Sequence, residues 1–199
     1  MTIFQINSIK NLGYIIISIA LLSLNSCQGQ GNRSQNKNEN ESISKQKVKA
    51  PGIDIHTATF YGNLDAVKQH INAGSDLNVK DEYGSTPLNI AATFGKTDIA
   101  LALIKAGADL HITNSEGSTP LHVAAFFCRT DIVKALLEKG ADKSLTNNYG
   151  STALMSVSGP FSEVEPFYQQ MSKNLGQFGL KLDFDHLEKT RPVIAEMLQ

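Results

Sequence analysis

Residues 84–92 read GSTPLNIAA, and the same stretch returns as GSTPLHVAA at 117–125 and, less completely, as GSTALM at 150–155. Three glycines share this offset of 33 residues: Gly74, Gly107 and Gly140. A fixed period of this length is typical of stacked supersecondary units, because one unit cannot bury its apolar face without its neighbours. The sequence therefore predicts a solenoid of repeats.

Each unit reads as two short helices. In the second unit Thr86 and Pro87 are typical of a helix start, with the threonine as N-cap and the proline at the first helical position. Gly95 can adopt the left-handed conformation that ends this inner helix. An apolar stripe then predicts an outer helix from residue 97 or 98 to residue 105.

The TPLHVA motif at 119–124 and the Gly-Ala-Asp triplets at 107–109 and 140–142 resemble the ankyrin repeat, and the resemblance covers residues 51 to 150. It implies an all-α ankyrin-repeat solenoid of about four helix-turn-helix units with β-hairpin-like turns. The expected units are residues 51–83, 84–116, 117–149 and 150–199.

The fourth unit departs from this pattern. Residues 190–198 match the outer helix at 129–137 with an offset of 61 instead of 33, which predicts an insertion of 28 residues between about 158 and 185. Gly159 and Pro160 break the inner helix, and an amphipathic helix follows. Its apolar face comprises Val164, Phe167, Tyr168, Met171 and Leu175.

The second half of the insertion has a different pattern. Four apolar residues alternate there and predict an extended segment against the stack: Phe178, Leu180, Leu182 and Phe184. We interpret the insertion as a C-terminal cap, because terminal repeats must close the core. A partner-specific insertion is the alternative.

The N-terminal residues have a different sequence pattern from the repeats. Lys10 precedes an apolar run of twelve residues, 13–24, which is too short to span a bilayer, so residues 1–26 are predicted to be a signal peptide. The run ends in LNSC at 24–27, which looks like the lipobox of bacterial lipoproteins and implies that Cys27 is acylated, for example with palmitate. An ordinary signal sequence with a chance cysteine is the alternative.

Residues 27–50 are predicted to form a lipidated cysteine followed by a flexible tether, since residues 28–50 have almost no apolar side chains and a net charge of +3. In Gram-negative bacteria a residue other than Asp after the lipidated cysteine, here Gln28, implies sorting to the outer membrane. The expected location is thus the cell envelope, with a lipid anchor on the outer membrane and the domain facing the periplasm.

The charge of the chain argues against nucleic-acid binding, and its cysteine content argues against stabilisation by disulfides. Residues 51–199 contain 12 Lys plus Arg and 17 Asp plus Glu, a net charge of −5, so no basic face for nucleic acid is expected. The chain has two cysteines, Cys27 and Cys128, and a lipidated Cys27 leaves no disulfide framework. Packing between repeats must then provide the stability.

The ankyrin resemblance implies contact residues at the ends of the inner helices and in the turns before the glycines. The helix-end set has five aromatic residues among six: Phe60, Tyr61, Thr93, Phe94, Phe126 and Phe127. The turn-tip set is Glu82, Tyr83, Ser115, Glu116, Asn148 and Tyr149. Together they predict an aromatic, acid-edged groove typical of protein interfaces. The alternative is that Phe94 and Phe127 only pack on neighbouring repeats.

Three weaker signals have structural interpretations. His122 is expected to hydrogen-bond backbone between repeats, and Cys128 stands where the other units have glycine, so that it must adopt a positive φ. A redox-sensing thiol is the alternative for Cys128. The acidic stretch Asp183, Asp185, His186 and Glu188 has no known metal-site spacing, and no metal or cofactor is expected.

The sequence thus favours a membrane-anchored, non-enzymatic, monomeric module that binds a protein partner. Some exported bacterial proteins of this family act beside catalases or toxins, so the resemblance implies an envelope enzyme or toxin that the chain stabilises or inhibits. Two alternatives stay open. One is an enzyme or metal- or ligand-binding protein that uses the insertion, and the other is a passive envelope scaffold.

Overall fold

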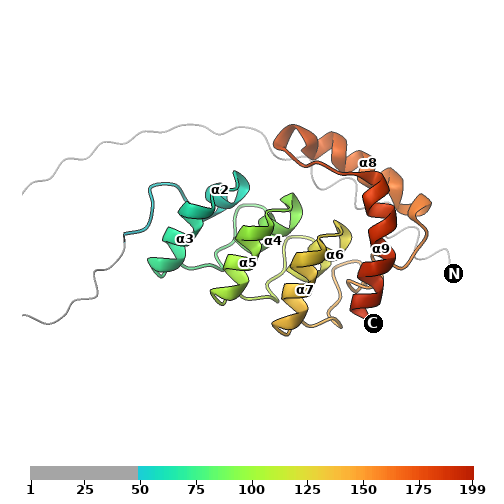
Figure 1. Ribbon diagram of the computed structural model, residues 1–199, viewed down its shortest axis with the longest axis horizontal. Coiled ribbons are helices and arrows are strands. Elements are labelled where there is room, and N and C mark those ends of the chain that lie inside the picture. Colours follow the sequence, from blue (N-terminus) through green and yellow to red (C-terminus); the bar gives the residue numbers. More distant parts are fainter. Residues whose placement is uncertain (1–48) are drawn as a thin grey trace, which may run out of the picture.

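The computed structural model describes residues 49–199, whose helices stack in the order of the chain (Figure 1). The repeats contribute α2 (Ile55–Phe60), α3 (Leu64–Asn72), α4 (Pro87–Phe94), α5 (Thr97–Lys105), α6 (Pro120–Phe126) and α7 (Thr130–Glu138). Within these described residues there is no strand. The predicted all-α solenoid of helix-turn-helix units is therefore confirmed. The predicted signal peptide, the predicted acylation site Cys27 and most of the predicted tether lie outside the described residues.

The helix ends follow the local sequence signals. Thr86 caps α4, its hydroxyl oxygen accepting the Asn89 backbone N–H at 3.3 Å, and Pro87 is the first helical residue. Gly95 ends the helix with φ of 63°, and α5 spans the predicted residues. The helix pair of the second unit is confirmed.

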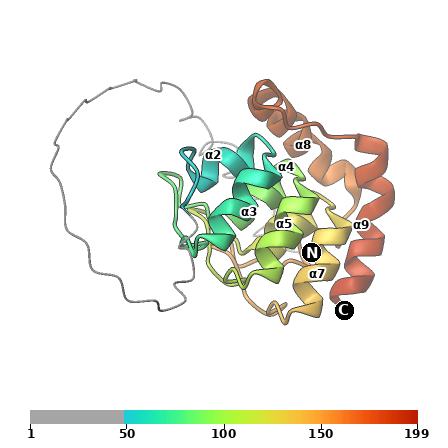
Figure 2. The same ribbon diagram turned by 60° about the vertical axis from the view of Figure 1, so that its left-hand side comes forward.

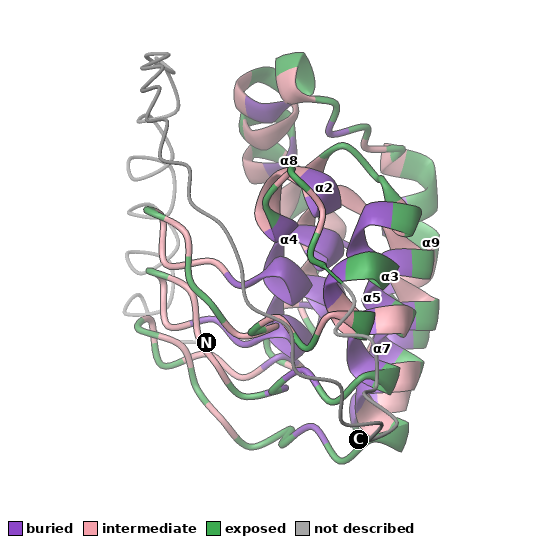
Figure 3. Ribbon diagram, turned by 90° about the vertical axis from the view of Figure 1, so that its left-hand side faces the viewer, coloured by how far each residue is buried: buried purple, intermediate pink, exposed green. Residues whose placement is uncertain are grey.

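The inner helices α2, α4 and α6 meet through a column of small side chains. Ala58, Ala91 and Ala124 occur at the 33-residue period and are each 0 % exposed. Val157 continues the column in the fourth unit and is 3 % exposed. Small residues allow close approach of the helices, and one core cluster contains buried residues from every unit. Figure 3 shows the buried segments of the helices in purple.

In each of the first three units, the side chain at one register position donates a hydrogen bond to a backbone carbonyl further along the chain, and that of His122 reaches the next unit. His56 Nε2 donates to the Val79 carbonyl at 2.8 Å, and Asn89 Nδ2 donates to the Ile112 carbonyl at 3.3 Å. His122 Nε2 donates to the Ser151 carbonyl at 3.0 Å, which confirms its predicted structural role. The other ring nitrogen of His122 lies 2.8 Å from the Thr119 hydroxyl, so both nitrogens are engaged.

The fourth unit replaces its inner helix with turns between residues 153 and 159. It continues with α8 (Phe161–Leu175), the short 3-10 helix η2 (Gly176–Phe178) and α9 (Phe184–Leu198). Figures 1 and 2 show α9 beside α7, in the row formed by α3 and α5, while α8 leaves this row. The extra amphipathic helix is confirmed, with Tyr168 and Leu175 buried.

The predicted extended segment is wrong at both ends. Phe178 belongs to η2 and Phe184 begins α9, so only residues 179–183 lack helix. Gly179 ends η2 with φ of 92°, and Asp183 caps α9 by accepting the His186 N–H at 3.1 Å. These two local signals override the alternation of apolar residues.

A buried arginine fixes the position of α8. The Arg191 side chain on α9 is 2 % exposed and donates to the Ser156 carbonyl at 2.9 Å and the Gly159 carbonyl at 3.2 Å. Its Nη1 also donates to the Tyr168 hydroxyl at 3.2 Å. That hydroxyl donates in turn to the Phe126 carbonyl at 2.5 Å. The network ties α8 both to α6 and to α9.

Cys128 has the predicted positive φ, 52°, among glycines that adopt the same conformation in the other units. The side chain is 3 % exposed, and Sγ lies 3.8 Å from the Leu187 carbonyl. Burial raises the pKa of the thiol to about 11 despite the nearby Arg191 and Arg129. The sulfur is therefore held as a neutral thiol.

We expect Cys128 to be unreactive in the folded protein. In a Cys27→Ser chain at pH 8, Ellman's reagent should label the native thiol at least about a hundredfold more slowly than the same chain unfolded in urea, because little thiolate forms. Labelling at a similar rate in both states would show an accessible thiolate and favour the redox interpretation.

His122 should make the stability of the fold depend on pH. Burial lowers the pKa of its imidazole below the ordinary 6.5, so the unfolded chain takes up a proton more readily than the folded one. The contribution of this group is present above about pH 6.5 and is lost as the pH falls through the folded-state pKa.

The matched variant is His122→Asn, since Asn89 fills the same position one unit earlier. Below pH 6.5 the unfolding free energies of wild type and variant should converge by up to about 1.4 kcal/mol per pH unit, as measured by urea titrations at pH 7.5 and 5.5. His186→Asn, at an exposed position on α9, is the control. A pH-independent difference between wild type and His122→Asn would contradict this assignment.

Candidate binding groove

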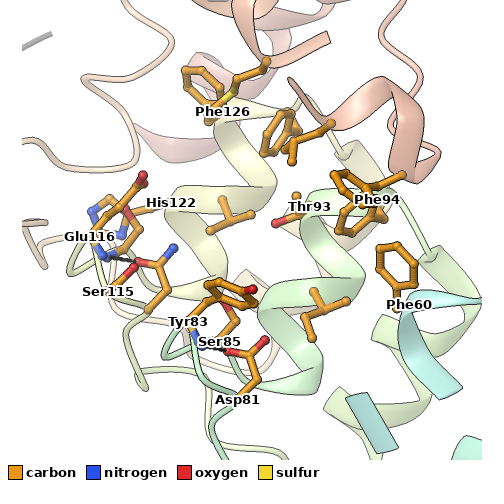
Figure 4. Close-up of a pocket in the computed structure, with 18 of the residues that line it drawn as sticks. Phe60, Asp81, Tyr83, Ser85, Thr93, Phe94, Ser115, Glu116, His122 and Phe126 are labelled. Carbon is orange, nitrogen blue, oxygen red and sulfur yellow. Dashed lines mark hydrogen bonds between the residues drawn. The ribbon is translucent and has the colours of Figure 1, made fainter. Parts of the chain in front are cut away.

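A groove of about 570 Å³ runs along the inner helices (Figure 4). Three parts of the chain line it: the C-terminal ends of α2, α4 and α6, the turn tips between repeats, and the inserted α8 and η2. The groove thus lies at the inner-helix ends and the turn tips, the positions where the sequence analysis expects partner contacts. This agrees with the expected concave face.

One side of the groove is aromatic. Phe60 and Phe94 meet edge to face with ring centroids 4.9 Å apart, and Phe60 meets Tyr61 in the same way at 5.2 Å. Phe126 lies 4.7 Å from Tyr168 of α8. Such pairs stabilise one another beyond their burial. The rings therefore form two contacting groups along this side, one at α2 and α4 and one at α6 and α8. We call the four lining rings Phe60, Tyr61, Phe94 and Phe126 the aromatic row.

The members of this row differ in exposure. Tyr61 is 72 % exposed, while Phe60, Phe94 and Phe126 are half-buried. Phe127 lines the groove but is only 5 % exposed, and most of its ring packs in the core. For Phe127 the packing interpretation describes most of the side chain. Thr93 lines the groove, and its hydroxyl donates to the Asn89 carbonyl at 3.0 Å.

The opposite side consists of the turn tips. At the same register position, Asp81, Asn114 and Asn147 each accept two backbone N–H groups with one side-chain oxygen. The distances from Asp81 are 2.9 Å to Tyr83 and 2.7 Å to Ser85. The sequence interpretation missed these three groove residues, although the period and the turn preference of Asp and Asn could have identified them.

The predicted tip residues divide into two groups. Tyr83, Ser115 and Glu116 line the groove. Glu82, Asn148 and Tyr149 are outside its lining. Asn148 instead joins two turns, because its Nδ2 donates to the Ser115 carbonyl at 3.1 Å. The predicted contact set is therefore brought together in part.

The insertion supplies the end wall of the groove. Met171 and Leu175 of α8 and Phe178 of η2 face the same space as the aromatic row. Leu175 is 5 % exposed, and Met171 packs against the main core. The apolar spacing of α8 was visible in the sequence, but its place beside the groove depends on the Arg191 network. The insertion closes the stack and shapes the groove.

The charges of the groove are acidic. In the part of the chain that the structure describes, no Lys or Arg lines it, whereas Asp81 and Glu116 do. Burial raises the pKa of the Glu116 carboxyl above its ordinary value. The ion pairs among residues 49–199 are His56 with Asp54 at 3.8 Å and His111 with Asp109 at 3.6 Å. Neither involves a groove carboxylate.

The groove has the features of a binding surface. His122 lines it, but burial lowers the pKa of the ring and both nitrogens are engaged, so the ring is a poor general base. Within residues 49–199 no three His, Cys, Asp or Glu residues are grouped to hold a metal ion. The acidic stretch of the insertion serves α9, where Asp183 is the N-cap.

The described helices are also too short or too polar to cross a membrane. No curated protein matches this chain. The family model for ankyrin repeats matches residues 55–147 in three copies. Ankyrin repeats are generally non-enzymatic modules for protein–protein interaction. The helix pairs of the structure agree with this match over residues 55–147.

Proposed function

We propose that the protein is a membrane-anchored interaction module that binds a protein partner in the groove. The observation that carries this proposal is the aromatic row, in which Phe60, Phe94 and Phe126 stay half-buried beside the exposed Tyr61. Aromatic anchors surrounded by polar groups are the residues that dominate protein interfaces. Here the turn tips provide the polar groups.

The rest of the described surface supports the choice of the groove. Other large hydrophobic residues with substantial exposure are Val79, Leu101, Met155 and Val193. They are at separate positions in the chain and none lines the groove. Scattered apolar residues are normal on a monomer, whereas a contiguous set favours a partner. The protein itself is proposed to be a monomer.

The proposed partner is an exported enzyme or toxin that the module stabilises or inhibits. A module that binds only the native partner stabilises it by mass action. A module that covers an active site inhibits it without any chemistry of its own. Both effects need a shaped surface and no catalytic group, in keeping with the engaged His122 ring.

The proposed anchor is an acyl group on Cys27, followed by the polar tether. As a coil, the roughly 23 tether residues have a root-mean-square span of about 25 Å, which would keep the repeats clear of lipid headgroups. Outer-membrane sorting with the repeats in the periplasm is part of the proposal. The support is the LNSC stretch at 24–27 and the residue that follows it, Gln28.

Truncating the groove should weaken partner capture. Tyr61→Ala and Met171→Ala remove side chains at opposite parts of the groove, and each should lower the affinity more than about tenfold if it removes an interface anchor. The measurement is quantitative pull-down from an envelope extract, with the melting temperature of each variant recorded. Val193→Ala, an exposed change on α9, is the matched control. Equal recovery of the same partners by all four chains would sink the proposed site.

The anchor has its own test. Wild type expressed in a bacterium should enter the detergent phase on Triton X-114 separation, because each buried methylene of an acyl chain contributes about 0.8 kcal/mol to membrane binding. Cys27→Ser should stay in the aqueous phase, and Cys128→Ser should behave as wild type. A wild-type chain in the aqueous phase would contradict lipidation while leaving the groove proposal intact.

A further inference from the structure

The groove has two chemically different sides (Figure 4). The labelled rings of Phe60, Phe94 and Phe126 lie on one side, and Asp81 and Glu116 lie at the turn tips on the other. A segment that fills such a groove must present apolar groups to one side and polar groups to the other.

Asp81 carries a charge that the turn does not need. In the next two units Asn114 and Asn147 form the same turn with a neutral amide oxygen, at distances of 2.9 to 3.1 Å from the backbone nitrogens. One oxygen acceptor is therefore sufficient for the turn geometry. The negative charge of Asp81 is an addition to the groove.

The charge of Glu116 is even less explained by the needs of the turn than that of Asp81. The equivalent positions one unit earlier and later are Tyr83 and Tyr149. The second unit places a carboxylate there, half-buried in the groove lining, and burial raises the pKa of this group. Among residues 49–199 no Lys or Arg lies within ion-pair distance of it. A partly desolvated carboxylate interacts more strongly with an incoming cation than an exposed one does.

We propose that the groove takes a segment of its partner that carries a lysine or arginine beside an apolar side chain. The cation lies against Glu116, on the side of the groove that Asp81 also makes acidic, and the apolar side chain lies between the aromatic row and the wall formed by Met171 and Phe178. This inference rests on the proposed function and adds the chemistry of the partner. The net charge of −5 on residues 51–199 favours the approach of the same basic segment.

The charge complementarity between the groove and a basic segment lies in the groove lining itself. The groove lining contains two carboxylates and, in the described part of the chain, no lysine or arginine. An acidic segment would meet the same two carboxylates unfavourably and would bring no cation to either of them. A wholly apolar segment would bury Glu116 further without compensation. Of the three, a mixed basic and apolar segment is the one that satisfies both sides.

The probe is a phage-displayed library of random dodecapeptides, selected on the full chain in mild detergent. Clones that also bind the Tyr61→Ala/Met171→Ala chain are discarded, so that the remaining clones report on the groove. The selected peptides should be enriched in lysine or arginine. They should bind Glu116→Gln about tenfold more weakly at low salt, and citrulline or glutamine in place of the basic residue should remove this difference.

Two controls isolate the charge. Glu138→Gln makes the same change at an exposed residue at the end of α7 and should bind the peptides as wild type does. Glu116→Gln should fold and melt at or above the wild-type temperature at neutral pH, because a group with a raised folded-state pKa opposes folding once it is ionised. A loss of binding therefore does not reflect unfolding.

Each contrary outcome has a separate meaning. Groove-dependent peptides without basic enrichment, or with equal affinity for Glu116→Gln, would overturn this inference and leave the proposed function standing. Failure to select any groove-dependent peptide would overturn both. If a synthetic peptide of residues 28–49 occupied the groove and a chain without residues 28–48 gained affinity for it, the occupant would be the chain's own basic segment, and the inference of a basic partner would be wrong.

Discussion

The close approach of the inner helices is the constraint on which the rest of the structure depends. Ala58, Ala91 and Ala124 are fully buried where the inner helices of successive units meet. A larger side chain there would separate α2, α4 and α6 and would strain the 3.0 Å hydrogen bond from the His122 ring to the Ser151 carbonyl of the next unit. Because the stack is regular, the ends of these helices align. The groove is a consequence of that alignment.

The repeats alone do not form the end wall of the groove. That wall belongs to α8 and η2, and the buried guanidinium of Arg191 holds α8 in place. A cation removed from water is unfavourable unless hydrogen bonds replace its hydration, and Arg191 has the Ser156 and Gly159 carbonyls and the Tyr168 hydroxyl for this purpose. Its Nε has no partner among the described residues, which leaves part of the desolvation uncompensated. In return, α8 is fixed against α6 through the Phe126 carbonyl. The end wall of the groove therefore depends on a polar network in the last unit.

This division explains what the sequence could predict. The helices of the repeats, the glycine turns, the positive φ of Cys128 and the aromatic row follow from local signals that recur every 33 residues. The wall was not predicted, because Tyr168 and Arg191 contact groups that are 32 to 42 residues away or in another helix and have no local signature. Phe127 shows the same limit, since its register position is that of a contact residue and its burial is decided by its neighbours. Asn148 was assigned to the partner surface from its place in the turn before Gly150, yet its amide donates to the Ser115 carbonyl of the preceding turn.

Glu116 shows how a regular framework can acquire specificity. The framework needs small side chains at the column, an oxygen at the turn and a hydrogen-bonding group on the inner helix, and none of these requirements distinguishes one partner from another. Glu116 meets no such requirement, because the neighbouring units have tyrosine at its position. With a raised pKa, its contribution to stability is present below about pH 4.5 and is lost as the pH rises through the folded-state value, so the ionised group opposes folding at neutral pH. A bound cation would offset much of this destabilisation by the ionised carboxylate. Binding would then stabilise the turn that contains Glu116. The residue that weakens the free module is thus the one that gives the groove a preference among ligands.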